Sequence, residues 1–365
     1  MGADVIKVEP PGQGDPMREW GRGEKPVWWA VAARNKRCIT LNLREPDGQR
    51  ILKQLLQNAD ILIENFRPGT LEKWGLGPNT LHALNSKLVI TRVSGFGQSG
   101  PYSQRAGYAS VGEAMGGFRY VNGYPDRPTT RAGISIGDSL AAMFACNASL
   151  AALHHAARTG EGQIIDATIY ESVLSVMEAT VAEYAVNGVT RERSGSYLPG
   201  IAPSNAYPCA DGEIVIGANQ DSLFRRLSDA MGHPEWAGNP RYATHRARGE
   251  HQEELDAVIA EWTRTRSVAE VDAAMEAAAI PCGPIYRAAD MLNDPHFQAR
   301  DTIIDVEHTS LPGLKMQNVF PRMSKTQGEV RWPGPEKLGQ HNDDVFAELG
   351  LGAAELSALR DKGVI

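Results

Sequence analysis

The chain has 365 residues, of which 42% are hydrophobic, and its 44 acidic and 37 basic side chains give a net charge of -7 at pH 7. This length is sufficient for two domains with hydrophobic cores, and an acidic balance without a dense block of Lys and Arg argues against a nucleic-acid partner. The four cysteines are scattered and form no CxxC pair, which predicts neither a disulfide framework nor a zinc site and favours a reducing cytoplasm. No stretch of about 20 uninterrupted apolar residues predicts a membrane span. Because the charge balance argues against nucleic acid, small-molecule substrates are expected.

The first quarter of the chain alternates predicted strands with predicted helices. Strands are expected at 4–8, 35–43, 60–64 and 88–93, and helices at 46–59 and in two short segments that end at Trp74 and Leu84. Such an alternation predicts a mostly parallel, helix-covered sheet. Ligands bind such sheets beyond the carboxyl ends of the strands, where the loops 65–69 and 94–100 lie.

One acidic residue, Asp138, opens a run that is otherwise almost uncharged. Residues 139–157 are mainly Ala, Leu, Met, Phe and small polar residues, which predicts a buried helix that is apolar around most of its circumference. The residue type and its position favour an N-cap for Asp138, near the positive end of the helix dipole, and the alternative is a carboxylate nucleophile for an acyl group. Adjacent His154 and His155 project about 100° apart on a helix and do not predict a metal site.

The second half of the chain predicts a smaller α/β domain. A polar, Gly/Pro-rich connection at 191–203 marks a domain boundary, and a hairpin is expected at 207–217 around the turn Asp211-Gly212. Amphipathic helices are expected at 221–231, 250–264 and 268–279, and further helices at 171–186, 288–292, 343–349 and 353–362. No internal repeat is present.

Several motifs, taken in order, carry a resemblance to a known family. They are GADVIKVEPP at 2–11, NKRCITLNL at 35–43, ENFRPGTLEKWGLG at 64–77, SGFGQSGPY at 94–102, GDS at 137–139 and TGEGQIIDATIYE at 159–171. Through them the chain resembles the family III CoA-transferases, the group of formyl-CoA and carnitine CoA-transferases, with α-methylacyl-CoA racemase as a relative. The resemblance extends over nearly the whole chain. It assigns the catalytic carboxylate to Asp138 rather than to Asp166.

The resemblance implies an acyl relay with CoA as part of the substrate and no metal. A carboxylate attacks a CoA thioester and passes through a mixed anhydride to an aspartyl-CoA thioester, which the acceptor acid consumes in reverse. By position, CoA contacts are expected from Leu41, Asn42, Arg44, Asn65, Phe66, Arg67, Lys73, Arg105, Gly107 and Tyr108, and a substrate contact from Gly200. Arg and Lys in this set would meet phosphates, whereas apolar side chains would meet adenine or pantetheine.

The fold that the resemblance implies is α/β, with a Rossmann-like large domain, a small α/β domain and an interlocked homodimer. We expect the large domain at 1–195, the small domain at 205–290 and a C-terminal tail at 300–365 that returns to the large domain. Long extended connections at 191–203 and 300–340 suit two chains threaded through each other.

Two departures from the family's pattern bear on the expected activity. In the family, the chain usually begins with a further strand and helix, whose connecting loop approaches the thioester, whereas the motifs of this sequence begin with those that follow that segment. Where racemases of the group carry a His-Asp pair for proton transfer, this chain has Tyr108-Ala109, which disfavours racemisation. CoA transfer to a free acid is therefore expected, and the alternatives are an α-methylacyl-CoA racemase and a CoA-binding protein with little turnover. The acceptor stays open among succinate, oxalate, an itaconate-like diacid and a carnitine-like acid.

Overall fold

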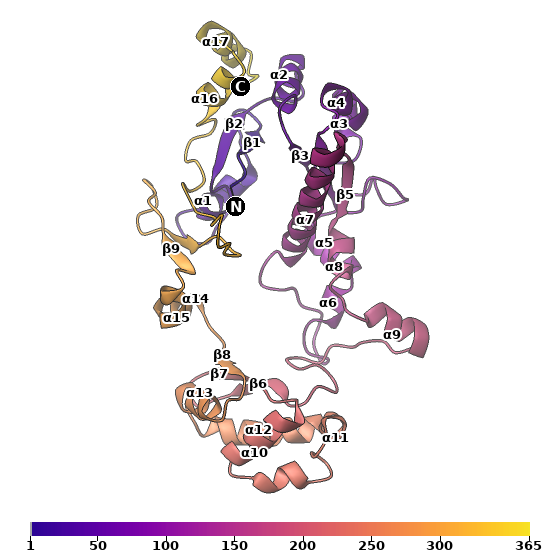
Figure 1. Cartoon of the computed structure of the whole chain (residues 1–365), viewed down its shortest axis with the longest axis vertical. Helices are drawn as coiled ribbons and strands as arrows, with labels where there is room; N and C mark the ends of the chain where they lie inside the picture. The colour runs from indigo at the N-terminus through magenta and orange to yellow at the C-terminus, as the bar shows by residue number, and fades with distance from the viewer. Residues whose placement is uncertain (1) are drawn as a thin grey trace. The chain divides into compact units, whose positions relative to one another are not determined.

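The computed structural model describes residues 2 to 365, and the chain divides into two compact units. Unit 1 comprises Met1–Tyr108, Ser139–Ile169 and Met291–Ile365, and unit 2 comprises Ala109–Asp138 and Tyr170–Asp290. Figure 1 colours the chain by residue number, so that the segments of each unit can be followed. Each unit is therefore assembled from segments that lie far apart in the sequence.

Unit 1 contains two parallel sheets. In the first, β1 (Val5–Glu9) pairs with β2 (Lys36–Thr40). In the second, the strands lie in the order β3 (Ile61–Glu64), β4 (Val89–Ser94), β5 (Ile164–Thr168). The predicted parallel strands are confirmed, but the prediction of a single sheet is wrong, because among residues 2 to 365 no strand of the β1-β2 sheet pairs with a strand of the β3-β4-β5 sheet.

Strand β2 is shorter than the strand predicted at 35–43, because its hydrogen-bonding partner ends first. The N–H of Leu41 donates to Glu9, the last residue of β1, and Pro10 follows. The N–H of Asn42 donates instead to Val364 at 2.8 Å, near the C-terminus. The chain therefore leaves the sheet at Leu41 and enters the loop before the next helix.

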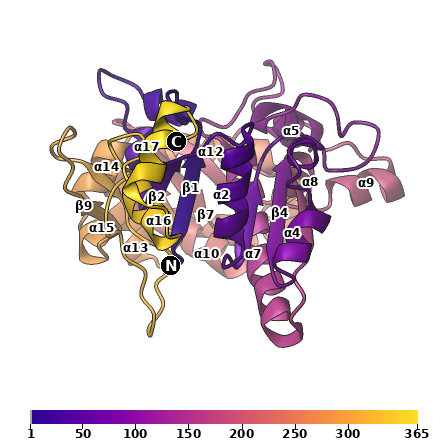
Figure 2. The ribbon, with the colours of Figure 1, turned by 90° about the horizontal axis from the view of Figure 1, so that it is seen from above.

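The helices of unit 1 include α1 (Trp28–Ala32), α2 (Pro46–Leu56), α3 (Thr70–Lys73), α4 (Pro78–Leu84), α15 (Pro295–Ala299), α16 (Asn342–Glu348) and α17 (Ala353–Asp361), with a 3-10 turn η1 at Pro16–Glu19. Helices α2, α3, α4, α16 and α17 lie close to their predicted positions, whereas α1, α15 and the 3-10 turn η1 had not been predicted. A short antiparallel pair, β9 (Ile303–Asp305) and β10 (Lys315–Gln317), lies in the C-terminal segment, and α14 (Ala288–Asn293) precedes it. Figures 1 and 2 show α16 and α17, in yellow, beside β1 and β2.

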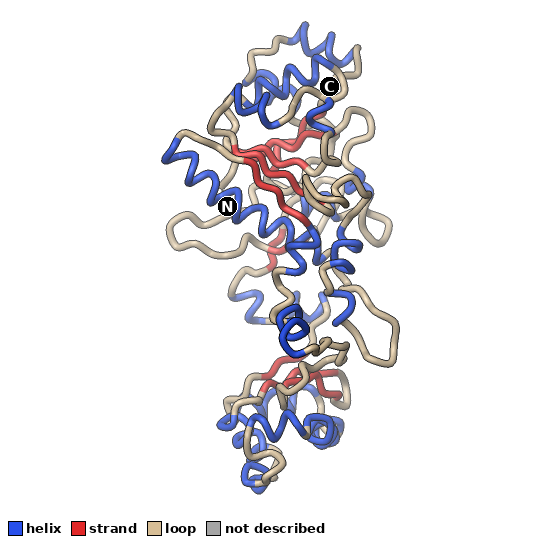
Figure 3. The backbone as a smooth tube through the Cα atoms, turned by 90° about the vertical axis from the view of Figure 1, so that its right-hand side faces the viewer, coloured by secondary structure: helices blue, strands red, loops and turns tan. Residues whose placement is uncertain are grey.

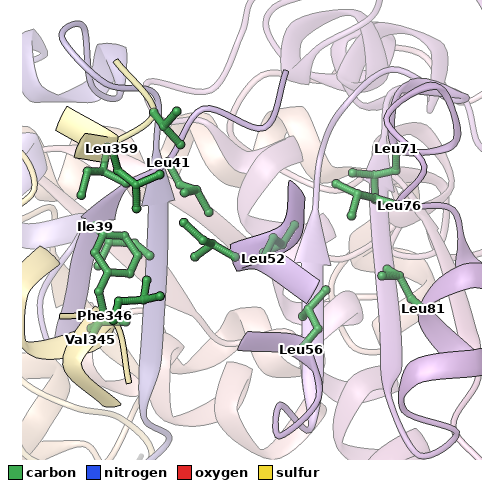
Figure 4. Packing of buried hydrophobic residues seen from close by; sticks show 14 of the residues in the cluster. Ile39, Leu41, Leu52, Leu56, Leu71, Leu76, Leu81, Val345, Phe346 and Leu359 are labelled. Carbon is green, nitrogen blue, oxygen red and sulfur yellow. The ribbon is translucent and has the colours of Figure 1, made fainter. Parts of the chain in front are cut away.

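One hydrophobic core joins the N-terminal and C-terminal segments of unit 1. The apolar stripe of α2, with Ile51, Leu52 and Leu56, is buried against side chains of β2 and of the C-terminal helices. Figure 4 shows Val345 and Phe346 beside Ile39 in this core. Burial of such side chains stabilises a fold by about 1.5–3 kcal/mol each, so the C-terminal tail is an integral part of unit 1.

Helix α7 (Ile136–Thr159) is less buried than its composition predicts. Its covered stripe consists of small residues, namely Ala141, Ala145, Ser149, Ala152 and Ala156, whereas Met143 is 63% and Leu150 51% exposed. The Ser149 hydroxyl is 2.7 Å from the Thr91 hydroxyl of β4, which anchors the stripe to the sheet. The predicted buried helix is therefore wrong for the single chain, because only one side of an all-round apolar helix is covered.

The length and apolar composition of α7 also match those of a membrane-spanning helix, contrary to the expectation from the sequence. The mean hydropathy of its most apolar 18 residues is 1.4, and 28% of that window is buried. The core helices of proteins outside membranes match the same criteria, so composition alone assigns no location to α7.

Unit 2 contains short helices that precede its small sheet in the chain. They are α5 (Ala109–Met115), α6 (Phe118–Val121), α8 (Ile169–Leu174) and α9 (Thr180–Asn187). A single helix was predicted at 171–186, but the chain breaks between α8 and α9, where Glu178 adopts a positive φ of 51°. Gly116 lies against α8 so closely that a Cβ there would be 2.7 Å from Val173.

The remainder of unit 2 is a three-stranded antiparallel sheet with helices on one face, as Figure 3 shows in red and blue. The strands are β6 (Ser204–Pro208), β7 (Glu213–Gly217) and β8 (Cys282–Pro284), and the helices are α10 (Asp221–Ala230), α11 (His245–Glu250), α12 (Gln252–Arg264) and α13 (Val268–Ala277), with a 3-10 turn η2 at Pro234–Gly238. The predicted hairpin is confirmed, with Asp211-Gly212 at its turn. Its alternation buries Ile214 and Ile216 against the helices and leaves Val215 44% exposed.

Candidate active site

Asp138 lies in the first turn of α7, because that helix begins two residues earlier at Ile136. An N-cap residue precedes its helix, so the capping interpretation of Asp138 is wrong. Its side chain is partly exposed, and among residues 2 to 365 no hydrogen bond reaches its carboxylate. The helix dipole favours the charged carboxylate, but partial burial and then the negative charge of Glu113 raise the pKa of Asp138 above its usual value.

Glu113 of α5 lies beside this first turn. Its side chain has no exposed surface, and its Oε1 is 3.4 Å from the backbone nitrogen of Gly137. The residue before Asp138 is thus in contact with a buried carboxylate. Asp138 therefore combines an accessible carboxylate, the positive end of a long helix and a negative neighbour, which is an arrangement suited to nucleophilic attack.

Asp166, the other carboxylate considered from the sequence, is engaged in holding a loop. It lies in β5, and its Oδ2 accepts the backbone N–H of Gln98 at 2.8 Å. A Cβ at Gly97, where φ is +93°, would come within 3.4 Å of the same oxygen. Asp166 thus fixes the Gly-rich loop after β4, and its carboxylate is not free in the way that the carboxylate of Asp138 is.

Three of the predicted CoA contacts lie in the connection between β2 and α2. Leu41 is only 2% exposed and belongs to the core, so in the single chain it offers almost no surface to a ligand. The Oδ1 of Asn42 accepts the N–H of Arg44 at 3.1 Å, and the Arg44 side chain is exposed. This loop packs against α2 only because residue 48 is glycine, since a Cβ at Gly48 would lie 2.0 Å from the carbonyl oxygen of Asn42.

Four more predicted contacts lie between β3 and the end of α3. Asn65, Phe66, Arg67 and Lys73 are all exposed. The ring of Phe66 lies edge-on to Trp74 with 5.2 Å between centroids, and the Phe66 N–H donates to Glu64 at 2.7 Å. The segment therefore presents an aromatic face and two cations at the carboxyl end of a parallel strand, where ligands of α/β proteins bind.

A buried ion network, which the sequence did not predict, anchors this segment. Arg92 in β4 donates from Nε to Glu64 and from Nη1 to Glu72, both at 2.7 Å. The side chains of Glu64 and Arg92 are 3% and 7% exposed, whereas that of Glu72 is 43% exposed. The network joins β3, β4 and α3 and thereby orders the loop that contains Asn65.

The last three predicted CoA contacts follow the Gly-rich loop. The guanidinium of Arg105 lies 3.8 Å from the ring centroid of Tyr102, a cation–π contact at the surface. Position 107 has no room for a larger residue than glycine, because a Cβ there would be 2.7 Å from the ring of Phe96. Tyr108 is 69% exposed and closes this stretch of unit 1.

Gly200, the predicted substrate contact, lies in unit 2 in the connection before β6. It adopts a positive φ of +81°, and its N–H donates to Oε1 of Gln252 at 3.0 Å. The CoA candidates thus belong to unit 1, whereas Asp138 and Gly200 belong to unit 2.

Two further residues were not among the candidates chosen from the sequence, although one of them, Gln98, lies in a motif that the sequence analysis quoted. Glu113 occupies a short helix, where a Glu is usually solvated, and only its burial singles it out. The Nε2 of Gln98, in the SGFGQSGPY motif, is buried and has no hydrogen-bond partner among residues 2 to 365. Buried polar groups are rarely left unpaired, so Gln98 is a further candidate for ligand contact.

The described residues 2 to 365 contain no group of three or more His, Cys, Asp or Glu side chains that could hold a metal ion. The chemistry available at Asp138 is that of a carboxylate acting on an acyl group, and the exposed cations of unit 1 are suited to phosphates. This α/β protein therefore has residue types that fit a transferase acting on a phosphorylated acyl carrier.

Comparison with known proteins gives the family. The model of CoA-transferase family III matches residues 1–342. The chain is 56% identical over 370 residues to the succinyl-CoA–D-citramalate CoA-transferase of Chloroflexus aurantiacus, covering 100% of this chain and 92% of that protein. It is 40% identical to the beta subunit of succinyl-CoA–L-malate CoA-transferase from the same organism, with the same two coverages. The crystal structure of a CAIB/BAIF family protein from Brucella suis matches with a TM-score of 0.83 and 34% identity, covering 95% of this chain and 92% of that one.

The chain belongs to CoA-transferase family III. It is an enzyme that transfers CoA from an acyl-CoA thioester to a free carboxylic acid, and its α/β fold with parallel sheets matches that of the Brucella suis protein. The family predicted from the motifs is confirmed, and the racemase alternative is not supported.

Proposed function

We propose that Asp138 is the nucleophile of the transfer and carries CoA as an aspartyl-CoA thioester. The observation that carries this proposal is an accessible carboxylate with no hydrogen-bond partner among the described residues, in the first turn of a 24-residue helix. A raised pKa supports it, because a more basic carboxylate is a stronger nucleophile once it is ionised.

The relay proceeds in four balanced steps. The Asp138 carboxylate attacks the thioester carbonyl, expels CoA thiolate and forms a mixed anhydride. The thiolate attacks the Asp138 carbonyl, releases the donor as a carboxylate and leaves the aspartyl-CoA thioester. The acceptor carboxylate attacks this thioester, giving a second anhydride and thiolate, and the thiolate attacks the acceptor carbonyl to yield the new acyl-CoA and free Asp138. The thioesters and the anhydrides are all activated acyl species of similar free energy. The acyl group can therefore pass from one to the next without being lost to water.

Succinyl-CoA is the proposed donor and a hydroxy dicarboxylate such as D-citramalate the proposed acceptor. Support comes from the 56% identity to a relative whose name gives these two substrates. The protein, incubated with succinyl-CoA and D-citramalate, L-malate or acetate, is expected to form the acyl-CoA of both hydroxy diacids with equimolar succinate, and none from acetate. Mass spectrometry of the CoA products checks this. Succinate release without a new acyl-CoA would contradict the transferase function.

The exposed cations of the β3–α3 segment are proposed to bind the phosphates of CoA. Arg67→Ala and Lys73→Ala should each raise the KM for acyl-CoA by about tenfold, because one phosphate contact is lost, while the KM for the acceptor acid changes little. Lys87→Ala, which removes an exposed cation elsewhere in unit 1, is the control. Equal effects on the KM values of both substrates would contradict the assignment of these cations to the phosphates of CoA.

An interlocked homodimer is proposed as the working form. The exposed side of α7 carries Met143, Phe144 and Leu150, and α9 leaves Tyr184 64% and Val186 80% exposed. Exposed apolar residues on each of these two helices mark interaction surfaces, and a second copy of the chain would cover them. Light scattering should give twice 39.6 kDa at every accessible concentration. A folded monomer that appears on dilution would rule out the dimer.

Three further features belong to the same proposal. A Rossmann-like arrangement is supported by the two parallel sheets of unit 1. The proposed small domain at 205–290 and the tail at 300–365 are supported by the small sheet and the returning C-terminal helices. The proposed large domain at 1–195 agrees less well with the two compact units, because 109–138 and 170–195 belong to the unit that contains the small sheet. A cytoplasmic location is supported by the scattered cysteines. Cell fractionation with an antibody to the protein would check the location.

A further inference from the structure

Glu113 is a buried carboxylate of unit 2 that joins α5, α6 and the first turn of α7. Besides its contact with Gly137, its Oε2 accepts hydrogen bonds from Nε and Nη2 of Arg119 in α6, both at 3.3 Å. The Glu113 side chain is 0% exposed and that of Arg119 is 27% exposed. The carboxylate thus connects α5, which contains it, with α6 and with the start of α7.

The contact with Gly137 fixes the backbone from which Asp138 projects. The first N–H groups of a helix have no partner within the helix and need one elsewhere. Gly137 is the second residue of α7, and Glu113 supplies an acceptor for its N–H. Removing a carboxylate from water costs free energy unless it is paired, and the ion pair with Arg119 offsets that cost for Glu113.

The charge of Glu113 also acts on the chemistry of its neighbour. Among the described residues, Glu113 is the ionisable group whose charge acts on Asp138, and Arg119 is the cation that faces Glu113. Acylation converts Asp138 from an anion into a neutral anhydride or thioester and thereby removes its repulsion by Glu113. An interaction that is unfavourable in the ionised state and disappears on acylation accelerates the attack.

We propose that Glu113 is a positioning residue for the transfer: held by Arg119, it fixes the start of α7 and favours loss of the negative charge on Asp138. This inference rests on the proposed role of Asp138 as the nucleophile. Glu113 itself takes no part in bond formation, because its side chain has no exposed surface from which to reach a thioester.

The test is Glu113→Gln, which keeps the size and an acceptor for Gly137 but removes the charge. We expect kcat to fall about tenfold or more with an unchanged KM for acyl-CoA. The acid limb of the kcat profile should move to lower pH, because loss of a neighbouring negative charge lowers the pKa of Asp138. Glu183→Gln is the matched control, since Glu183 pairs with Arg191 in the same unit at 2.7 Å but lies away from Asp138 in sequence.

Wild-type kcat and an unshifted acid limb in Glu113→Gln would overturn the proposal. So would a loss of kcat that is fully explained by a lower melting temperature. If Glu113→Gln does not fold, Arg119→Gln, which removes the cation that holds Glu113, should show the same fall in kcat at constant KM, and wild-type kcat there would also overturn the proposal. A covalent adduct found in the wild type at a residue other than Asp138 would instead defeat the proposed function, which keeps the two failures distinguishable.

Discussion

Asp138→Asn is expected to reduce CoA transfer by about three orders of magnitude or more, because an amide cannot attack a thioester to form an anhydride. CoA affinity should not change, since the predicted CoA contacts are elsewhere in the chain. Stopped assays with succinyl-CoA and D-citramalate measure the rate, and calorimetric titration measures CoA binding. Full transfer by the Asn variant would show that the nucleophile is another residue.

The direction in which Asp138→Asn changes the stability of the protein can also be predicted. Partial burial and Glu113 raise the pKa of Asp138, so the folded protein favours the neutral carboxyl more than the unfolded chain does. At pH 7 the ionised Asp138 therefore costs stability, and Asn removes that cost. The melting temperature of the variant should equal or exceed that of the wild type at pH 7, and the difference should shrink as the pH falls through the raised pKa. Asp166→Asn, which retains an acceptor for the Gln98 N–H, is the control for activity.

Arg92→Ala is expected to lower the free energy of unfolding by about 3–5 kcal/mol, because it leaves the carboxylate of Glu64 buried without a cation. Chemical denaturation monitored by circular dichroism measures the loss. The Asn65–Arg67 segment should also lose order, which would raise the KM for acyl-CoA in whatever variant protein remains folded.

Glu72→Gln is the matched control for that prediction. Glu72 binds the same guanidinium at 2.7 Å, but its side chain is 43% exposed, so losing its charge should cost no more than about 1 kcal/mol. If Arg92→Ala and Glu72→Gln are equally stable, the network does not anchor the segment as described.

Local patterns correctly predicted the elements whose own residues show a hydrophobic periodicity and also contain a signal for where the element begins or ends. Helix α2 has its apolar stripe and begins with Pro46 at the first helical position, which Pro tolerates, and the β6–β7 hairpin has an Asp-Gly turn between alternating residues. Strand β2 was predicted too long, because its end is decided by where β1 ends and not by its own residues. Sheet membership likewise depends on distant partners.

Burial was the least predictable property of the candidate site. Helix α7 is apolar on all sides, so its sequence does not tell which side the chain covers, and the covered stripe is the one with the smallest side chains. Glu113 and Arg92 are charged residues in ordinary local sequence, and their importance comes from contacts made across the fold. The motif at 137–139 located Asp138, but its buried neighbour became visible only in three dimensions.

The most direct test of the account is to trap the covalent intermediate in the wild-type protein. Incubation with succinyl-CoA without an acceptor, followed by hydroxylamine, should convert the aspartyl-CoA thioester into a hydroxamate and release CoA. Peptide mapping by mass spectrometry is expected to place the hydroxamate on Asp138. A hydroxamate on Asp166 or Glu171, or no modification in protein that transfers CoA at full rate, would contradict the assignment of Asp138 as the nucleophile.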